Sequence, residues 1–236
     1  MMTLTPEEWT AVRLSLKVAT VAALCSLPVG LGLALLLARG RFWGRGILGL
    51  FVYLPLVLPP VVTGYLLLVL FGRNGVLGAP LAEHFGIVFA FRWTGAALAA
   101  AIMGLPLMVR TMVLSLQAVD HRLEQAASTL GAGRLRVFAT ITLPLAAPGI
   151  LAGTILSFAK AFGEFGATIT FVSAIPGVSQ TLPVAIYGYT QMPGGDAAVL
   201  RLTLVAVVIS MTALGLSEWL AQRVTRQIAG QNARAG

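Results

Sequence analysis

Five long apolar stretches constrain this chain more than any other feature of its sequence. They lie near residues 18–38, 47–71, 93–117, 145–172 and 198–220. A helix needs about 20 apolar residues to cross the roughly 30 Å of hydrocarbon in a bilayer. Only 10% of the residues are charged, whereas soluble domains carry about 25%. The sequence therefore predicts an all-α membrane protein with five transmembrane helices, forming a single domain over 1–236 with its core at about 11–222.

Several prolines fall inside these stretches. They are Pro28, Pro55, Pro59, Pro60 and Pro106. A helix in a soluble protein tolerates proline badly, but neighbouring transmembrane helices can satisfy the freed backbone groups. We interpret them mainly as kinks that suit helix packing, with hinges as the alternative.

Basic residues divide unevenly between the two sides of the predicted bundle. If the polar segment 120–144 is cytoplasmic, that side holds ten: Arg39, Arg41, Arg45, Arg110, Arg122, Arg134, Arg136, Arg223, Arg226 and Arg234. The other side holds five: Arg13, Lys17, Arg73, Arg92 and Arg201. Because cytoplasmic loops are enriched in Lys and Arg, this bias predicts an outer N-terminus and a cytoplasmic C-terminus. Arg13 and Lys17, directly before the first stretch, run against the bias.

The polar segment 120–144 separates the third and fourth apolar stretches. From Asp120 to Leu130 its residues favour a helix, with an acidic residue near the start and Gly131 at the position of a C-cap glycine. A second apolar face follows, until Pro144 and Pro148 mark the return to the membrane. We expect a helical hairpin that projects into the cytoplasm. Such helices also lie on lipid surfaces, and spacing alone does not separate the two interpretations.

The spacing within this segment resembles a known motif. Gln125-Ala126-Ala127, three residues, Gly131, nine residues, Ile141, one residue and Leu143-Pro144 are similar to the "EAA" loop of membrane subunits of binding-protein-dependent ABC importers. Here the motif's glutamate is replaced by Gln125, and Glu124 stands just before it. The resemblance implies that this loop couples the chain to an ATPase subunit and that Glu124 or Gln125 makes the polar contact.

Within that superfamily the chain resembles the molybdate importer permeases along nearly its whole length. The stretches LPLVLPPVVTGYLLLVLFGRNG (54–75) and SFAKAFGEFGATITFVSAIPG (157–177) carry the likeness, and Gly163-Glu164-Phe165-Gly166-Ala167 is shared with sulfate-type permeases. The resemblance implies the type I ABC importer transmembrane fold in a bacterial inner membrane. It also implies a second copy of the chain, two cytoplasmic ATPase subunits and an external oxyanion-binding protein as partners. Sulfate or tungstate import is the alternative.

Two ionisable residues fall within the fourth predicted span. Lys160 and Glu164 are four residues apart, and charges at such depth normally face protein or a water-filled cavity. Lys160 is a candidate for attracting a dianion in transit, with Glu164 restraining it; the alternative is a purely structural ion pair. Gly163, Gly166 and Thr168 beside them are small enough to let the helices of two copies approach closely.

Other chemistry has little support in the sequence. No G-x-x-x-x-G-K-[ST] phosphate loop is present, so energy must come from another protein and the chain itself is not expected to be an enzyme. Cys25 is the single cysteine, and His84 and His121 are isolated; we expect no cofactor, metal site or catalytic group. The net charge of +8 suits anionic lipid better than nucleic acid. An ATP-independent channel or secondary transporter is a weaker alternative, because it would not need the cytoplasmic hairpin.

Overall fold

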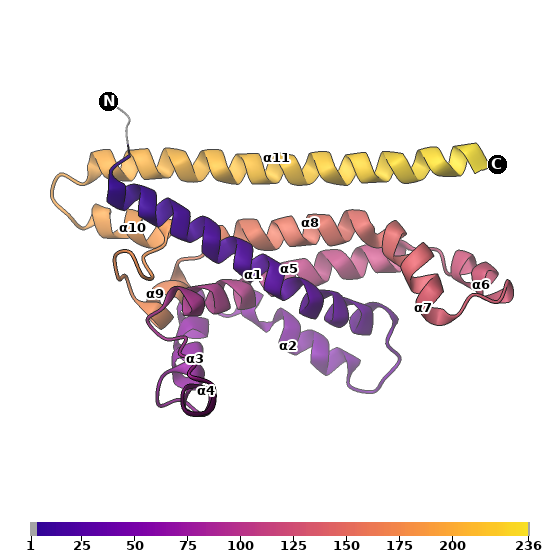
Figure 1. Cartoon of the computed structure of the whole chain (residues 1–236), viewed down its shortest axis with the longest axis horizontal. Helices are drawn as coiled ribbons and strands as arrows, with labels where there is room; N and C mark the ends of the chain where they lie inside the picture. The colour runs from indigo at the N-terminus through magenta and orange to yellow at the C-terminus, as the bar shows by residue number, and fades with distance from the viewer. Residues whose placement is uncertain (1–3, 236) are drawn as a thin grey trace.

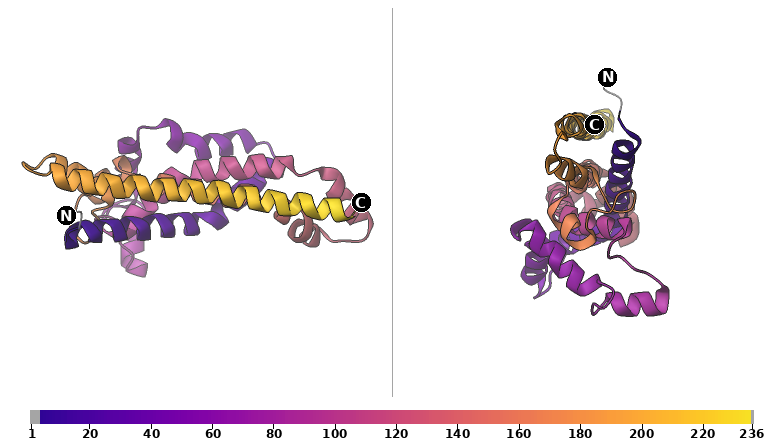
Figure 2. Two further views of the ribbon diagram at one scale, coloured as in Figure 1. Left: turned by 90° about the horizontal axis from the view of Figure 1, so that it is seen from above. Right: turned by 90° about the vertical axis from the view of Figure 1, so that its left-hand side faces the viewer.

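Four long helices run side by side along the molecule. The computed structural model describes residues 4–235, without the side chains of 220, 221 and 223–235, so Arg223, Arg226 and Arg234 of the predicted charge bias lie outside the described side chains. The long helices are α1 (Pro6–Arg39), α5 (Trp93–Ala118), α8 (Leu143–Phe162) and α11 (Asp196–Ala235), seen in Figure 1 and from two other sides in Figure 2. Every element of the described part is helical.

Four helical stretches are long and apolar enough to cross a membrane. They are Pro6–Arg39, Trp93–Ala118, Arg134–Phe162 and Asp196–Trp219. A fifth crossing requires α2 (Arg45–Val57) and α3 (Pro60–Phe71) together, and these two helices are bent by 115°. The helical membrane architecture is thus confirmed, while the number of crossings is four or five by length and composition.

The second predicted span is not one helix. Leu58 and Pro59 both have extended backbone, with ψ of 140° and 132°. A residue that precedes proline avoids the helical region, so the Pro59-Pro60 pair ends α2 and starts α3 in a new direction. The change of direction at Pro59-Pro60, 115°, is a break between two helices rather than a kink within one. Pro28 and Pro106, in contrast, lie inside the continuous helices α1 and α5.

The first helix begins earlier than hydropathy indicates. Thr5 caps α1, because its hydroxyl accepts a hydrogen bond from the Glu8 N–H at 3.2 Å while Glu8 Oε2 accepts from the Thr5 N–H at 2.8 Å. This reciprocal box stabilises a helix N-terminus. Arg13 and Lys17 consequently lie inside α1 rather than before the helix.

The fourth predicted span, 145–172, is also divided. Helix α8 ends at Phe162, and the short helix α9 (Gly166–Val172) follows after a break. Further on, α10 (Leu182–Thr190) buries Leu182, Val184 and Ala185 in the bundle. The remaining short helix, α4 (Gly78–Phe85), follows α3.

Helix α5 lies at the centre of the bundle and is packed closely by small residues. Its Met108, Met112 and Leu116 are fully buried. A Cβ added at Gly104 would lie 2.5 Å from the Ser157 hydroxyl of α8, which is closer than real side chains approach. The two helices therefore cross at a distance that only glycine allows.

Polar contacts fasten the N-terminal end of α1 to later helices. Glu8, 1% exposed, forms an ion pair with Arg201 of α11 at 2.6 Å. The Ser15 hydroxyl accepts a hydrogen bond from the Leu182 N–H of α10 at 2.6 Å. The segment 120–144 lies at the opposite end of the bundle (Figure 1).

Candidate functional site

The segment 120–144 contains a short helix with well-defined ends. Helix α6 (His121–Thr129) starts at Asp120, whose carboxylate accepts a hydrogen bond from the Arg122 N–H at 2.9 Å. It ends in a Schellman motif: Gly131 has φ of +86°, the Gly131 N–H donates to Ser128 O, and the Ala132 N–H donates to Ala127 O. The predicted helix and its glycine C-cap are therefore confirmed.

Glu124 fixes this helix to the rest of the chain. Its Oε2 accepts from Arg39 Nη1 at 2.5 Å and contacts His121 Nδ1 at 3.1 Å. Its Oε1 accepts from the Thr142 hydroxyl at 2.5 Å. Only 17% of the Glu124 side chain is exposed. We name Arg39, His121, Glu124 and Thr142 the hairpin anchor.

The hairpin anchor joins four parts of the fold at one point. Arg39 is the last residue of α1 and also donates from Nη2 to the Leu116 carbonyl near the end of α5, at 3.1 Å. Thr142 ends the π-helical turn η1 (Phe138–Thr142). Burial of Glu124 opposes its ionisation, but the hydrogen bonds from Arg39, Thr142 and His121 together outweigh that effect and lower its pKa. The carboxylate is therefore charged at neutral pH.

The outer face of the hairpin is exposed and partly apolar. Gln125 and Ala126 are exposed on α6, and the large side chains of Leu130 and Leu135 are 89% and 84% exposed. Apolar side chains left in this way are typical of surfaces that meet a partner or a membrane. A cleft of about 400 Å³ lies next to the anchor, lined in part by Arg134 and Phe138.

The descent from the hairpin into the membrane differs from the prediction. After α7 (Arg134–Val137), the helix continues through η1 into α8 without a break. Pro144 has no N–H to donate, and the chain accommodates it at the start of α8, directly after the wider π turn. The sequence indicated a boundary at Leu143-Pro144. In the structure these residues do not interrupt the helix.

The second site lies where α8 gives way to α9. Lys160 Nζ and Glu164 Oε2 are 2.7 Å apart, with 32% and 2% of their side chains exposed. Glu164 Oε1 also accepts from the Ala167 N–H at 3.0 Å. The prediction that both residues share one continuous helix is wrong, because α8 ends at Phe162 with Gly163 as its C-cap. The break instead lets one carboxylate bind both the ammonium group and the start of α9.

Small residues near this ion pair allow α3 and α9 to touch. A Cβ added at Gly64 would lie 2.6 Å from the Ala167 carbonyl, and one added at Gly166 would lie 2.7 Å from Pro60 Cβ. Thr168 is 1% exposed. The close approach of Gly166 is thus within one chain; a contact of these residues between two copies stays a prediction.

Comparison with known proteins identifies the family. The family model described as "Binding-protein-dependent transport system inner membrane component" matches residues 27–226. The chain belongs to this family. It is 57% identical to the "Molybdenum transport system permease protein ModB" of Escherichia coli (strain K12), over 98% of this chain and 100% of that one. The "Sulfate transport system permease protein CysW" of Synechococcus elongatus is 38% identical over 75% of this chain and 61% of that one.

A solved structure shares the fold of this inner membrane component. It is a crystal structure of a bacterial ABC transporter involved in the import of alginate, with a TM-score of 0.74 and 18% identity over 94% of this chain and 81% of that one. The chain is therefore a membrane subunit of a transport system that depends on a binding protein, and it is not itself an enzyme.

Sequence reasoning found the helix of this permease but missed its attachment. Arg39 is 85 residues from Glu124 and Thr142 is 18 residues away. Arg39 had been noted only for its charge at the end of the first span. Of the other motif residues, Ala127, Ile141 and Leu143 are half-buried and Pro144 is exposed.

Proposed function

We propose that this permease forms the translocation path of an ATP-driven molybdate importer, together with a second copy of itself. The near full-length likeness to a relative named as a molybdenum transport permease carries this proposal. ATP is hydrolysed in separate cytoplasmic subunits, and an external binding protein delivers the oxyanion. The whole chain, 1–236, serves as one transmembrane domain.

Helix α6 is the element that docks on the ATPase subunit. Gln125 and Ala126 are exposed, whereas both oxygens of Glu124 are occupied within the chain. We therefore assign the polar contact with the ATPase to Gln125. Ala126 permits close approach of the partner, and Gly131 turns the chain back.

Movement of the docked helix reaches the membrane through the hairpin anchor. A displacement of α6 pulls on Arg39 at the end of α1 and on Thr142 at the approach to α8. Packed helices respond to such displacement by small sliding movements. Closure of two ATPase subunits would in this way shift the helices that line the path.

Lys160 is the residue we assign to the passing anion. Its side chain is one-third exposed while Glu164 is buried, so the ammonium group is the accessible member of the pair. Partial neutralisation by Glu164 lets a dianion be attracted without being trapped. The outer N-terminus and cytoplasmic C-terminus follow from the distribution of basic residues.

The decisive experiment is uptake in proteoliposomes. Vesicles contain this chain, its ATPase subunits and binding protein, and receive labelled molybdate with or without ATP. We expect ATP-dependent uptake that excess molybdate abolishes and excess sulfate reduces less. Sulfate import is the second candidate, because the chain also resembles a sulfate permease, and stronger competition by sulfate would favour it. Equal uptake without ATP would contradict both and indicate a channel.

A further inference from the structure

Two cations at the N-terminal end of α1 are not explained by the transport function. Arg13 and Lys17 are exposed, and they oppose the charge bias that orients the chain. Both lie against tryptophans: Arg13 Cζ is 5.2 Å from the ring centre of Trp9, and Lys17 Nζ is 3.6 Å from that of Trp93. None of the ion pairs among the described residues involves either cation. Glu8, the buried carboxylate nearby, is paired with Arg201 instead.

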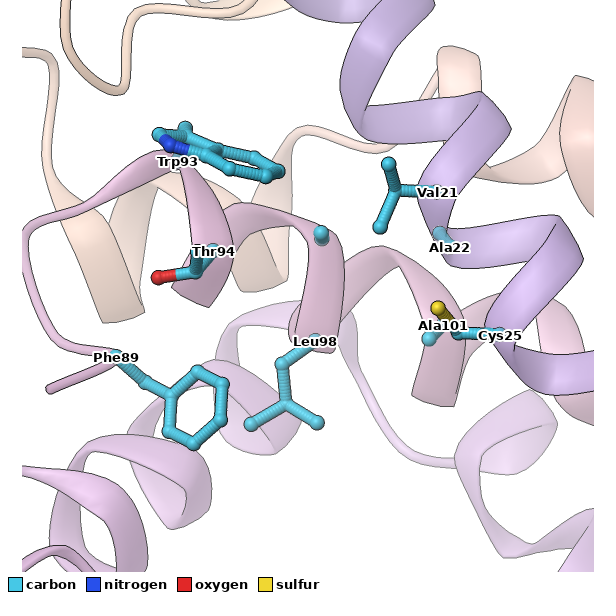
Figure 3. A pocket seen from close by; sticks show the side chains of 9 residues that line it. Val21, Ala22, Cys25, Phe89, Trp93, Thr94, Leu98 and Ala101 are labelled. Carbon is cyan, nitrogen blue, oxygen red and sulfur yellow. The ribbon is translucent and has the colours of Figure 1, made fainter. Parts of the chain in front are cut away.

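An apolar groove begins directly beside these cations. It lies between α1 and α5 and has a volume of about 220 Å³. Figure 3 shows its lining, which is Val21, Ala22, Cys25, Phe89, Trp93, Thr94, Ala97, Leu98 and Ala101. Thr94 carries the only side-chain hydroxyl among these residues, so the groove has few groups that could form hydrogen bonds with water.

The groove and the cations share one face of α1. Lys17, Val21 and Cys25 follow one another at intervals of four residues, which places them along the same side of a helix. From Lys17 to Cys25 the helix rises about 12 Å, most of the depth of one leaflet's hydrocarbon. Trp93, the first residue of α5, stands at the mouth, where aromatic side chains meet the headgroup layer.

We propose that this groove binds one acyl chain of a phospholipid with an anionic headgroup. The acyl chain lies against Val21, Cys25 and Leu98, and the phosphate lies between Lys17 and Arg13. An anionic lipid fits better than a second copy of the chain, because neither cation at the mouth has a carboxylate partner among the described residues, and both attract negative charge rather than more apolar surface. The lipid would hold α1 against α5 at the end of the bundle far from the hairpin anchor. This inference does not depend on which anion is transported.

Native mass spectrometry of the assembled transporter tests the proposal. The purified complex is incubated with phosphatidylglycerol or phosphatidylcholine, and retained lipid is counted per copy of the chain. We expect wild type to retain one phosphatidylglycerol. Cys25→Phe fills the groove and should lose most of that retention. Leu24→Phe is the matched control: Leu24 is 57% exposed, adjacent in sequence and absent from the groove lining, so retention should be unchanged.

A charge variant tests the headgroup separately. Lys17→Gln should remove the preference for phosphatidylglycerol over phosphatidylcholine, whereas Arg73→Gln, at an exposed arginine outside the groove, should preserve it. Equal retention by wild type and Cys25→Phe would overturn the proposal. So would efficient oxidative cross-linking of Cys25 between two copies in vesicles, since a second copy would then cover the groove.

The native cysteine gives a measurement that needs no variant. Cys25 is the single cysteine of the chain, so N-ethylmaleimide reports on the groove alone. Alkylation of Cys25 should be several-fold slower in nanodiscs of phosphatidylglycerol than in phosphatidylcholine. Equal rates in the two lipids would overturn the proposal even if Cys25→Phe does not fold.

Discussion

Replacing Glu124 by glutamine should loosen the hairpin without unfolding the bundle. The substitution keeps the side chain's shape but removes the charge that binds Arg39, Thr142 and His121. Hydrogen bonds to charged groups contribute about 1.5–3 kcal/mol each, whereas exposed ion pairs contribute about 0–1 kcal/mol. The side chains of Arg39 and Glu124 are 22% and 17% exposed, so the energy of their contact should lie between these two limits. Glutamine also retains one hydrogen-bond acceptor. We therefore expect a loss of about 1–3 kcal/mol in local stability.

Hydrogen exchange followed by mass spectrometry measures this loss. A change of 1–3 kcal/mol corresponds to roughly 5- to 150-fold faster local opening, so amides of α6 should exchange faster by that factor while those of α5 do not change. Gln125→Ala, one residue further along, is the control. It should leave exchange unchanged but lower molybdate uptake, because Gln125 faces the ATPase in our proposal. Unchanged exchange of α6 in Glu124→Gln would refute the anchoring role.

Ionisation of Glu124 makes the local stability of α6 depend on pH. The pKa of Glu124 is lowered in the folded chain from an ordinary value of 4.5. A group with a lowered pKa stabilises the fold fully above its unfolded pKa, and this contribution is lost as pH falls through the folded pKa. Below pH 4.5, the amides of α6 in wild type should therefore exchange faster, after correction for intrinsic exchange rates. Glu124→Gln should not show this acid-dependent increase.

Three further substitutions test other parts of the fold. Gly131→Val forces a β-branched residue to φ of +86°, costing about 1–2 kcal/mol. It should uncouple ATP hydrolysis from uptake, whereas Gly133→Ala, also in open space, should not. Lys160→Met should lower uptake without lowering membrane abundance; full uptake would make the ion pair structural only. Gly64→Ala brings a Cβ within 2.6 Å of the backbone of α9 and should destabilise the chain by about 1–3 kcal/mol in thermal unfolding, unlike Gly46→Ala, whose Cβ meets nothing.

Local signals in the sequence predicted local structure well. The helix from Asp120 and its end at Gly131 depend on capping groups within a few residues, so they can be recognised from the sequence alone. Apolar length also found the four long spans, because it measures what a helix needs in a bilayer. Apolar length does not show in which direction a helix runs, however. For this reason it did not predict the 115° bend between α2 and α3 or the break between α8 and α9 before Glu164.

Contacts between distant residues account for most of what the sequence missed. The partner of Glu124 is 85 residues away, and that of Glu8 is 193 residues away. No spacing rule links such positions; the two ends of α1 meet elements far along the chain, Glu8 meeting α11 and Arg39 meeting α6. The motif comparison drew attention to Glu124 and Gln125 together; their different environments become evident only when Arg39 is placed beside α6.

The π-helical turn Phe138–Thr142 carries one of the residues that hold α6 in place. A π turn accommodates one residue more than an α turn, and each residue of an α-helix corresponds to about 100° of rotation. Deleting one residue here would restore α geometry with little net rotation of the hairpin, but it would remove a residue from the turn that carries Thr142. Thr142 donates a hydrogen bond to Glu124 from this turn, so the deletion should weaken the contact that holds α6 in the position where Gln125 is exposed.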